Sequence, residues 1–435
     1  MKSKYKIGFL GMGTVAQGVW RHLANNHAEM SRRLGADYEL SVACVRSAAK
    51  KRGVEIAPER LTENPEDVVS NPEIDVVCEL MGGVETAFKL VKKAVENGKI
   101  VITANKAMLC EKGAELFALL EKNPKSQIFF EASVAGGIPI IKSLREGLVA
   151  NRFSLIYGIL NGTCNYILTR MERENATYEA VLEDARRLGY VEADESLDID
   201  GIDSAHKAAV LAYLAHGRWV KLSEMIVNGI REIRLEDMLW AREFGCRIKL
   251  LASIKRDSET GKISVAVYPA LLPLSDVVAN VNEVFNAVAL EGDLVGRTVH
   301  IGRGAGQNAT ASAVISDIAD AFRALNSNAK YVSCHASNGV EMMPLKDIES
   351  SFYMRLSVKD ETGTLAKIAS IFASQKVSIE LLEQKRHVNA NEAWLILTTH
   401  KTSEFAIREA CKALEESEQV LEKPFVLRIF EDTQA

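Results

Sequence analysis

The sequence lacks any long run of apolar residues, and this absence narrows the classes of protein that it can encode. No window of the 435 residues approaches the eighteen or more apolar residues that a membrane helix requires. A strong charge of one sign is also missing, since the formal net charge is -5 with acids and bases interspersed. Without a basic field that could neutralise phosphates, nucleic acid is not an expected partner, and without a membrane helix a membrane is not expected either.

Cysteine is scarce and shows no pattern. The seven cysteines are odd in number, scattered along the chain and never spaced as CxxC. This spacing argues against a structural zinc site and favours reduced thiols in a cytoplasmic protein. The Cys and His ligands of zinc alcohol dehydrogenases and the Tyr-x-x-x-Lys pair of short-chain dehydrogenases are missing too.

What is present is an ordinary globular composition. Hydrophobic residues make up 47% and charged residues 26% of the chain, which argues against a disordered or fibrous protein. A chain of 435 residues is too long for one ordinary core, so two or three domains are expected. The start, MKSKYKIGFLGMG, is basic and then apolar like a secretory signal, but its apolar part is short and glycine-rich, which indicates a first strand.

Residues 1–135 carry the pattern of a dinucleotide-binding domain. From Lys6 to Leu160, short apolar runs alternate with helical patterns; the runs include KIGFL, YELSVACV, IDVVCEL, KIVIT, QIFFEAS and FSLIYGIL. Near-continuous apolar strands in this order predict an α/β fold with a Rossmann-like, doubly wound parallel sheet. Ligands of such sheets bind at the carboxyl ends of the strands.

The rest of the chain divides into three parts. Residues 136–325 mix helical and strand patterns and predict an α+β domain, whose last helix we expect to return to the first domain. Residues 326–350 lack periodicity and are rich in Asn, Ser and Lys, which indicates a linker. Residues 351–435 follow the ferredoxin-like βαββαβ order.

A glycine motif follows the first predicted strand. In GFLGMGTVAQG, residues Gly11, Gly13 and Ala16 have the GxGxx(G/A) spacing before an amphipathic helix. Gly11 allows a tight turn, Gly13 lets the backbone approach a pyrophosphate, and Ala16 lets helix and strand pack closely. The motif predicts dinucleotide binding, with a plain glycine turn as the alternative.

The second predicted strand ends in bases where an NAD site would carry an acid. The run CVRSAAKKR supplies Arg46, Ser47, Lys50 and Lys51, which suit the 2′-phosphate of NADP. NADP is therefore favoured over NAD, and a solvated basic helix start is the alternative.

Three further junctions between elements could carry chemistry. Lys106, in VITANKAML, could approach the nicotinamide or a substrate carboxylate, or be an exposed loop lysine. The small residues of FEASVAGGIPII, 130–141, leave carbonyls that could hold a hard cation with a carboxylate, or form a packing turn. Cys164 begins a predicted helix, where a thiolate would have a lowered pKa, or it is a small buried residue.

The stretch EADESLDIDGIDSAHK, residues 192–207, concentrates six acids beside one lysine. A helix is expected from Ile202 to His216, which puts Asp203 and Lys207 at i and i+4 on one face. A surface pair contributes only ~0.2–0.5 kcal/mol, and the ligand register of a calcium loop is missing. The pattern therefore favours a site in which Glu192 and Asp203 bind an ammonium group while Lys207 exchanges a proton with an oxygen.

Several long phrases resemble the homoserine dehydrogenase family. They lie in family order over residues 6–320 and read GFLGMGTVAQGV, VITANKAML, FEASVAGGIPII, GILNGTCNYIL, GYVEADESLDIDGIDSAHKAAVLA and GRGAG with TASAVISDI. The resemblance implies reversible NAD(P)H-dependent reduction of L-aspartate 4-semialdehyde to L-homoserine, in threonine, methionine and isoleucine biosynthesis. Residues 136–325 would then form the substrate-binding, catalytic and dimerisation domain of a homodimer or homotetramer.

The resemblance also implies roles for individual residues. Lys207 is expected to donate and accept the proton, with Asp203 beside it in the catalytic set. Substrate binding is expected at Glu192, Asp203 and Asp198. Together with Arg46, cofactor contacts are expected at Gly11, Gly13, Thr14, Val15, Lys106, Gly189 and Gly306. A monovalent cation, usually sodium, is expected at Glu131, Val134, Gly136 and Ile138. The sequence departs from the family at Ala16, Gln307 and Asn308.

The C-terminal phrase VKDETGTLAKIASIFASQKVSIELLEQ resembles an ACT domain. This resemblance implies an amino-acid effector, with threonine expected as an inhibitor, bound near Asp360 and Gly363. Two alternatives to a homoserine dehydrogenase stay open on the sequence. One is a Cys164-dependent semialdehyde dehydrogenase, and the other is a non-catalytic sensor of nucleotides and amino acids.

Overall fold

The computed structural model describes residues 4–187, 195–327, 339–386, 389 and 391–431. The chain divides into two compact units. The first comprises residues 1–156, 203–224 and 284–340, and the second comprises residues 157–202, 225–283 and 341–435. Each unit is therefore assembled from segments that lie far apart in the sequence. None of the helices in the described part of the chain has the length and apolar character needed to cross a bilayer.

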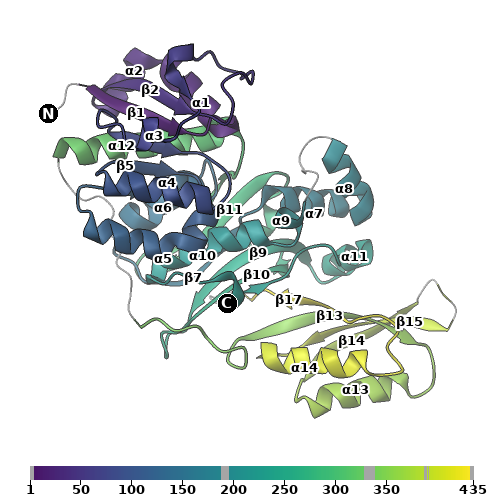
Figure 1. Cartoon of the computed structure of the whole chain (residues 1–435). Coiled ribbons are helices and arrows are strands. Elements are labelled where there is room, and N and C mark those ends of the chain that lie inside the picture. The colour runs from purple at the N-terminus through teal and green to yellow at the C-terminus, as the bar shows by residue number, and fades with distance from the viewer. Residues whose placement is uncertain (1–3, 188–194, 328–338, 387–388, 390, 432–435) are drawn as a thin grey trace. The chain divides into compact units, whose positions relative to one another are not determined.

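The first unit is built on a six-stranded parallel sheet in the order β3-β2-β1-β4-β5-β6 (Figure 1). Its strands are β1 (Lys4–Leu10), β2 (Asp37–Cys44), β3 (Leu61–Thr62), β4 (Val76–Glu79), β5 (Ile100–Thr103) and β6 (Ile128–Phe129). The helices between them are α1 (Thr14–Asn25), α2 (His27–Leu34), α3 (Glu66–Val69), α4 (Glu85–Glu96) and α5 (Lys106–Lys122). The strand order reverses between β1 and β4, which creates the crevice where such sheets bind ligands.

A helix from the far end of the unit completes this core. Helix α12 (Gln307–Ser327) lies against the N-terminal sheet (Figure 1). Its buried Phe322 meets the ring of Tyr5 at a centroid distance of 4.9 Å and that of Tyr38 at 6.5 Å. The unit also contains α6 (Ile140–Lys142), α10 (Ile202–His216) and the antiparallel hairpin of β11 (Phe285–Gly292) and β12 (Gly296–Arg303).

The second unit combines a helical part with a larger sheet. Strand β7 (Phe153–Ile159) leads into it from the first unit. Its helices are α7 (Gly162–Glu174), α8 (Tyr178–Arg187), α9 (Ser196–Ile199) and α11 (Leu235–Glu243). Strands β9 (Cys246–Arg256) and β10 (Ile263–Pro273) form a long antiparallel hairpin, and the short β8 (Ile226–Val227) pairs with β10.

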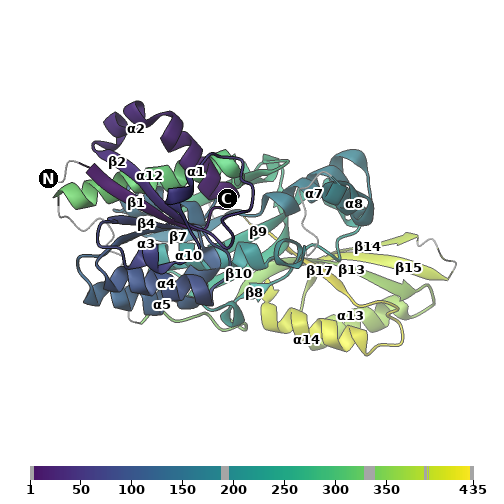
Figure 2. The ribbon, with the colours of Figure 1, turned by 45° about the horizontal axis from the view of Figure 1, so that its top comes forward.

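The C-terminal part of this unit has the ferredoxin-like plan. It consists of β13 (Glu349–Lys359), α13 (Thr364–Ser374), β14 (Ile379–Arg386), β15 (Glu392–Thr399), the short β16 (Thr402–Ser403), α14 (Glu404–Glu415) and β17 (Phe425–Ile429). The strand order is β17-β13-β15-β14, and α13 and α14 lie together on one face of the sheet (Figures 1 and 2). Strand β17 also pairs with β10, which joins this sheet to the β9–β10 hairpin. The predicted fold class is confirmed.

Two predicted strands differ from the structure. The apolar run QIFFEAS yields only the two-residue β6, because the chain turns into a 3-10 helix at Glu131–Ser133. The run FSLIYGIL forms β7, but β7 is not a strand of the six-stranded parallel sheet. An apolar run predicts a buried strand, and the sheet that receives it depends on tertiary packing.

Candidate active site

Helices α5 and α10 are held together by an aromatic cluster. Tyr213 of α10 stacks on Trp219 with ring centroids 4.1 Å apart, and Phe117 of α5 meets these two rings at 4.9 and 5.5 Å. Gly113 of α5 lies so close to Trp219 that an added Cβ would meet the indole at 2.6 Å. Aromatic pairs contribute about 0.5–1.5 kcal/mol beyond their area burial. The cluster therefore fixes the relative position of the two helices that carry the site.

One carboxylate bridges two lysines on these helices. Asp203 Oδ2 accepts a hydrogen bond from Lys207 Nζ at 2.6 Å, and Asp203 Oδ1 lies 3.2 Å from Lys106 Nζ. Only 11% of the Asp203 side chain and 10% of the Lys207 side chain are exposed, against 38% for Lys106. Burial of an ion pair adds little to stability, because desolvation offsets the attraction. A functional role explains this cluster better than a stabilising one.

Lys106 occupies the first position of α5, where the helix dipole disfavours a cation. Asn105 caps the helix by accepting a hydrogen bond from the backbone amide of Met108 at 3.1 Å, and its own side-chain amide donates to Gly83 O at 2.8 Å. The cap holds Lys106 just past the carboxyl end of β5. Lys106 and the N-terminus of α5 together create a region of positive potential, and the carboxylate of Asp203 faces it.

The acids of the stretch 192–207 have different surroundings. Three residues with predicted or open roles lie outside the described residues, namely Gly189, Glu192 and Asp194. Glu195 pairs with Arg186 at 2.9 Å, and Asp200 pairs with Arg231 at 2.6 Å. The arginines lower the pKa of Glu195 by hydrogen bonding. Part of the excess negative charge is thus neutralised locally, which the sequence pattern did not indicate.

Asp198 and Cys164 meet in the second unit. Asp198 Oδ1 accepts a hydrogen bond from Asn161 Nδ2 at 2.7 Å, and the Asp198 carbonyl accepts one from Cys164 Sγ at 3.2 Å. Asn161 also caps α7, because its side-chain oxygen accepts from the Cys164 amide at 2.8 Å. Cys164 is fully buried. A thiol in this position holds the end of α9 in place and is inaccessible to a substrate, which argues against a nucleophile.

A pocket of about 580 Å³ lies at the carboxyl ends of β1, β2 and β4. Gly11 there has φ +91°, its amide donates to Cys44 O at 2.9 Å, and an added Cβ would lie 2.8 Å from Leu80 O. At Gly13, by contrast, an added Cβ would meet nothing within 4 Å. Gly11 therefore makes the turn, and Gly13 leaves open space through which a pyrophosphate can approach α1.

The predicted basic residues line the same pocket, namely Arg46, Ser47, Lys50 and Lys51. All four are exposed, and among the residues that the structure describes the three bases have no ion-pair partner. Thr14 lines the pocket as well, and Val15 follows it in the first turn of α1. Gly306, with φ +110°, precedes α12. The pocket therefore combines positive charge with open space at Gly13, as the binding of a dinucleotide requires.

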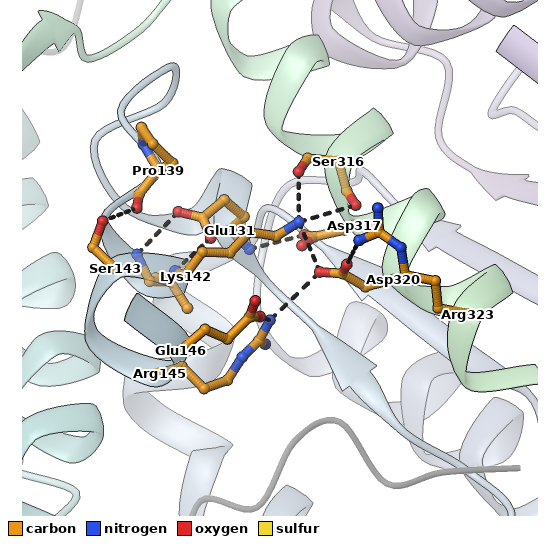
Figure 3. A network of polar contacts seen from close by, with 11 residues as sticks. Glu131, Pro139, Lys142, Ser143, Arg145, Glu146, Ser316, Asp317, Asp320 and Arg323 are labelled. Atoms are coloured by element: carbon orange, nitrogen blue, oxygen red, sulfur yellow. Dashed lines mark hydrogen bonds and ion pairs between the residues drawn. The ribbon is translucent and has the colours of Figure 1, made fainter. Parts of the chain in front are cut away.

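Glu131 lies at the centre of a buried polar network in the first unit (Figure 3). Its carboxylate accepts hydrogen bonds from the backbone amides of Ile141 at 2.9 Å and Lys142 at 2.8 Å, which belong to the first turn of α6. Burial raises the pKa of Glu131 to about 6, although the two amides act in the opposite direction. The carboxylate is thus held in place by the backbone and lacks a full counter-charge.

Asp317 of α12 extends this network. Its Oδ2 accepts from the Glu131 amide at 2.8 Å, and burial together with the charge of Glu131 raises its pKa well above the usual value. Lys142 Nζ donates to Ser316 Oγ at 2.6 Å and pairs with Asp320 at 2.7 Å (Figure 3). Sequence reasoning missed Asp317 and Lys142. The available signal was a pair of acids at i and i+3 on an otherwise apolar helix face.

The chain after Glu131, where the cation site is predicted, makes a tight turn. Ala135 and Gly136 have φ values of +53° and +48°, so two successive residues are left-handed. An added Cβ on Gly136 would lie 2.4 Å from Gly304 O, which requires glycine. Val134 and Ile138 flank this turn. In the described part of the chain no cluster of three His, Cys, Asp or Glu side chains could hold a metal, so any ion here would depend on carbonyls.

The predicted effector residues lie between β13 and α13. Asp360 Oδ1 accepts a hydrogen bond from Gln384 Nε2 at 3.0 Å, and its amide donates to Asn391 O at 2.8 Å. Gly363 has φ +93° and begins α13. Thr364 Oγ1 donates to Gln419 Oε1 at 2.8 Å. The loop is thus ordered by side chains from its own domain.

Family models match most of the chain. Residues 11–131 match the homoserine dehydrogenase NAD binding domain, residues 139–319 match homoserine dehydrogenase, and residues 352–419 match the ACT domain. Homoserine dehydrogenase of Neisseria gonorrhoeae is 42% identical over 97% of both chains, and that of Pseudomonas aeruginosa is 40% identical over 95% of this chain and 96% of its own.

Solved structures agree with these matches. A homoserine dehydrogenase from Thiobacillus denitrificans superposes with a TM-score of 0.90 at 38% identity and covers 98% of both chains. A hyperthermophilic archaeal homoserine dehydrogenase in complex with NADPH superposes with a TM-score of 0.62 at 28% identity, over 74% of this chain and 98% of its own.

Proposed function

Because this chain belongs to the homoserine dehydrogenase family, NAD(P)-dependent oxidoreductases acting on a CH–OH group, we propose that Lys207 transfers the proton in its reaction. The reaction interconverts L-aspartate 4-semialdehyde and L-homoserine. Family membership removes the two alternatives, a Cys164-dependent acylating enzyme and a non-catalytic sensor. The observation that carries the proposal is the buried carboxylate of Asp203 between Lys207 and Lys106.

In reduction, Lys207 donates a proton to the carbonyl oxygen of the semialdehyde, and in oxidation it takes the proton back. The bound nicotinamide supplies or accepts the hydride. Asp203 accepts a hydrogen bond from Lys207 and thereby fixes the direction of its N–H groups. Lys106 adds a second positive charge, which favours negative charge developing on the substrate oxygen.

The substrate ammonium is assigned to Glu192, Asp203 and Asp198. Both oxygens of Asp203 already face lysines, so Asp203 acts chiefly on Lys207 and shares the ammonium with the other acids. Asn161 Nδ2 donates to Asp198 Oδ1 at 2.7 Å, which fixes the orientation of the Asp198 carboxylate.

NADP is the proposed cofactor of preference. The open space at Gly13 and the 580 Å³ pocket support a dinucleotide, and the exposed bases Arg46, Lys50 and Lys51 on its lining support recognition of a 2′-phosphate. Lys106 and Gly306, with Gly189, are assigned to the nicotinamide half of the molecule.

A sodium ion is proposed at Glu131, Val134, Gly136 and Ile138. The buried Glu131 carboxylate, with its raised pKa, would supply the negative charge, and backbone carbonyls of the turn at Ala135 and Gly136 would supply the other ligands. The ion would neutralise Glu131 and rigidify the connection between β6 and α6.

Threonine is proposed as an inhibitory effector of the ACT domain, at the loop of Asp360 and Gly363, and the enzyme is assigned to threonine, methionine and isoleucine biosynthesis. A homodimer or homotetramer is proposed on symmetry grounds. The six cysteines of the described residues are free thiols, which supports a cytoplasmic location.

The decisive experiment measures NADPH oxidation with aspartate semialdehyde for the wild type and for Lys207→Ala. We expect kcat to fall by about 10²–10⁴ while the affinity for NADPH is kept. Lys93→Ala is the matched control, because Lys93 is an exposed lysine of α4 that pairs with Glu66. A kcat near the wild-type value for Lys207→Ala would show that another group transfers the proton.

A further inference from the structure

The loop that carries the 2′-phosphate candidates is attached to α1 at a single glycine. The Gly53 amide donates to Gln17 Oε1 at 2.7 Å, and the Gly53 carbonyl accepts from Arg21 Nη2 at 2.9 Å. Gln17 and Arg21 stand at i and i+4 on α1, so one helix face holds both polar atoms of one residue. An added Cβ on Gly53 would lie 3.3 Å from Gln17 and 3.5 Å from Arg21, which shows how closely the two side chains enclose it.

The same two side chains connect this loop to the phosphate-binding turn. Gln17 Nε2 donates to Met12 O at 3.1 Å, inside the glycine motif. Arg21 Nη1 donates to Gln307 Oε1 at 3.0 Å, and Gln307 Nε2 donates to Thr14 O at 2.9 Å. Gln307 is one of the positions at which the sequence departs from the family. Its side chain therefore links the start of α12 to the first turn of α1.

The loop itself is folded around Arg52. The guanidinium of Arg52 donates to Ser47 O at 2.6 Å and to Lys50 O at 2.7 Å, and the Ala48 amide donates to Glu63 Oε1 at 2.7 Å. Arg52 thus holds the loop in shape, whereas the neighbouring Arg46, Lys50 and Lys51 are exposed and line the pocket.

We propose that Gln17 and Arg21, with Gln307 holding Arg21, form a clasp on Gly53 that positions the loop 46–52 and thereby determines the preference for NADP over NAD. This inference rests on the proposed binding of the 2′-phosphate by that loop. Ordering an exposed loop costs conformational entropy, and a loop that is already ordered binds its ligand without that cost. The pyrophosphate is bound by the glycine motif, which keeps its own backbone contacts when the clasp is lost. Loss of the clasp should therefore weaken the 2′-phosphate contact selectively.

Arg21 is the residue to change, because it holds Gly53 from outside the cofactor pocket. In Arg21→Met we expect the KM for NADPH to rise about fivefold, in line with the loss of the one hydrogen bond from Arg21 to the loop, while the KM for NADH changes by less than about twofold. Arg21→Lys keeps the charge and loses the two-pronged geometry, so it should resemble Arg21→Met rather than the wild type. Arg33→Met is the control, since Arg33 is an exposed arginine of α2 that pairs with Glu29.

Competitive inhibitors distinguish a specific effect on the position of the loop 46–52 from general damage to the cofactor site. For Arg21→Met we expect the inhibition constant of adenosine 2′,5′-bisphosphate to rise about fivefold and that of AMP to stay unchanged. Equal weakening of both inhibitors, or full recovery in Arg21→Lys, would overturn the clasp. If the wild type bound the bisphosphate no better than AMP, the NADP preference itself would be wrong, and the inference would fall with it.

Discussion

Lys207 Nζ lies 2.6 Å from Asp203 Oδ2, one helical turn away on α10, and each side chain is only about one-tenth exposed, at 10% and 11%. A pair with this spacing on a helix surface is worth about 0.3–0.5 kcal/mol. Here burial removes solvent screening, and Lys106 at 3.2 Å adds a second cation to the same carboxylate. Two ammonium groups and one carboxylate leave one net positive charge, which suits an oxygen that becomes negative during reduction.

Asp203→Asn keeps the shape of the side chain and removes the shared counter-charge. The two lysines then repel each other, and Lys207 loses the group that orients it, so we expect kcat to fall by about 10²–10³ with little change in NADPH binding. In the double variant Asp203→Asn/Lys207→Met the loss should be no larger than in Lys207→Met alone, because the two residues act as a unit. If the loss of kcat in the double variant equalled the product of the two single losses, this interpretation would be contradicted. Glu29→Gln, at the exposed ion pair with Arg33, is the control.

Gly13→Ala separates cofactor binding from folding. An added Cβ meets nothing within 4 Å in the free protein, so the midpoint of thermal unfolding should stay within about 2 °C of the wild type. The methyl group would occupy the path of the pyrophosphate, and the KM for NADPH should rise about tenfold or more.

Gly11→Ala should instead lose both stability and binding, because its φ is +91° and its Cβ would lie 2.8 Å from Leu80 O. Gly35→Ala is the control for backbone strain alone, since Gly35 has φ +73° and open space around it. Fluorescence titration with NADPH and thermal unfolding would distinguish the three variants. An unchanged KM in Gly13→Ala would show that the pyrophosphate binds elsewhere.

Local spacing predicted some of these features and not others. The helix Ile202–His216 and its i,i+4 pair followed from periodicity within the segment. The contact between Lys106 and Asp203 depends on packing of α5 against α10, which no local pattern encodes. The hydrogen bond from Glu131 to Asp317 joins positions 186 residues apart. Tertiary packing decides long-range contacts of this kind. The family resemblance assigned roles to these residues, but the sequence did not predict which residues they contact.

A buried ion pair links the ferredoxin-like domain to α11. Arg355 Nε donates to Asp237 Oδ1 at 2.9 Å, the hydroxyl of Tyr353 donates to the same oxygen at 2.9 Å, and burial raises the pKa of Asp237. Arg355 is 4% exposed and lies over the ring of Phe425 at 4.8 Å. The ion pair therefore attaches the ferredoxin-like domain to α11. Removing either residue alone should lower the free energy of unfolding.

Arg355→Met would leave the Asp237 carboxylate buried without its cation, at a cost of about 3–5 kcal/mol in the free energy of unfolding. The pKa of Asp237 then lies further above its unfolded value, so the variant should become less stable as pH rises from about 5 to 8. The double variant Arg355→Met/Asp237→Leu should recover most of the loss. Urea unfolding at both pH values measures this, with the exposed Arg234→Met as control. A small, pH-independent loss in the single variant would contradict it.

Glu131 makes stability depend on pH in a defined window. Its pKa is raised from 4.5 to about 6 in the folded protein, chiefly by burial. Between these values the folded state holds more protons than the unfolded state, so the free energy of unfolding falls as pH rises through the window. Above about pH 6 the full penalty of about 2 kcal/mol applies. Glu131→Gln should remove this slope, measured by urea unfolding from pH 4.5 to 7.5.

The same carboxylate gives a direct test for the proposed sodium ion. A cation binds the ionised form, so it lowers the pKa of Glu131 and cancels the penalty only where the carboxyl is charged. Sodium chloride should therefore raise the midpoint of thermal unfolding more at pH 7.5 than at pH 5, relative to choline chloride at equal ionic strength. In Glu131→Gln the difference between the two salts should vanish. An equal effect of sodium at both pH values, or its persistence in Glu131→Gln, would place the ion away from Glu131.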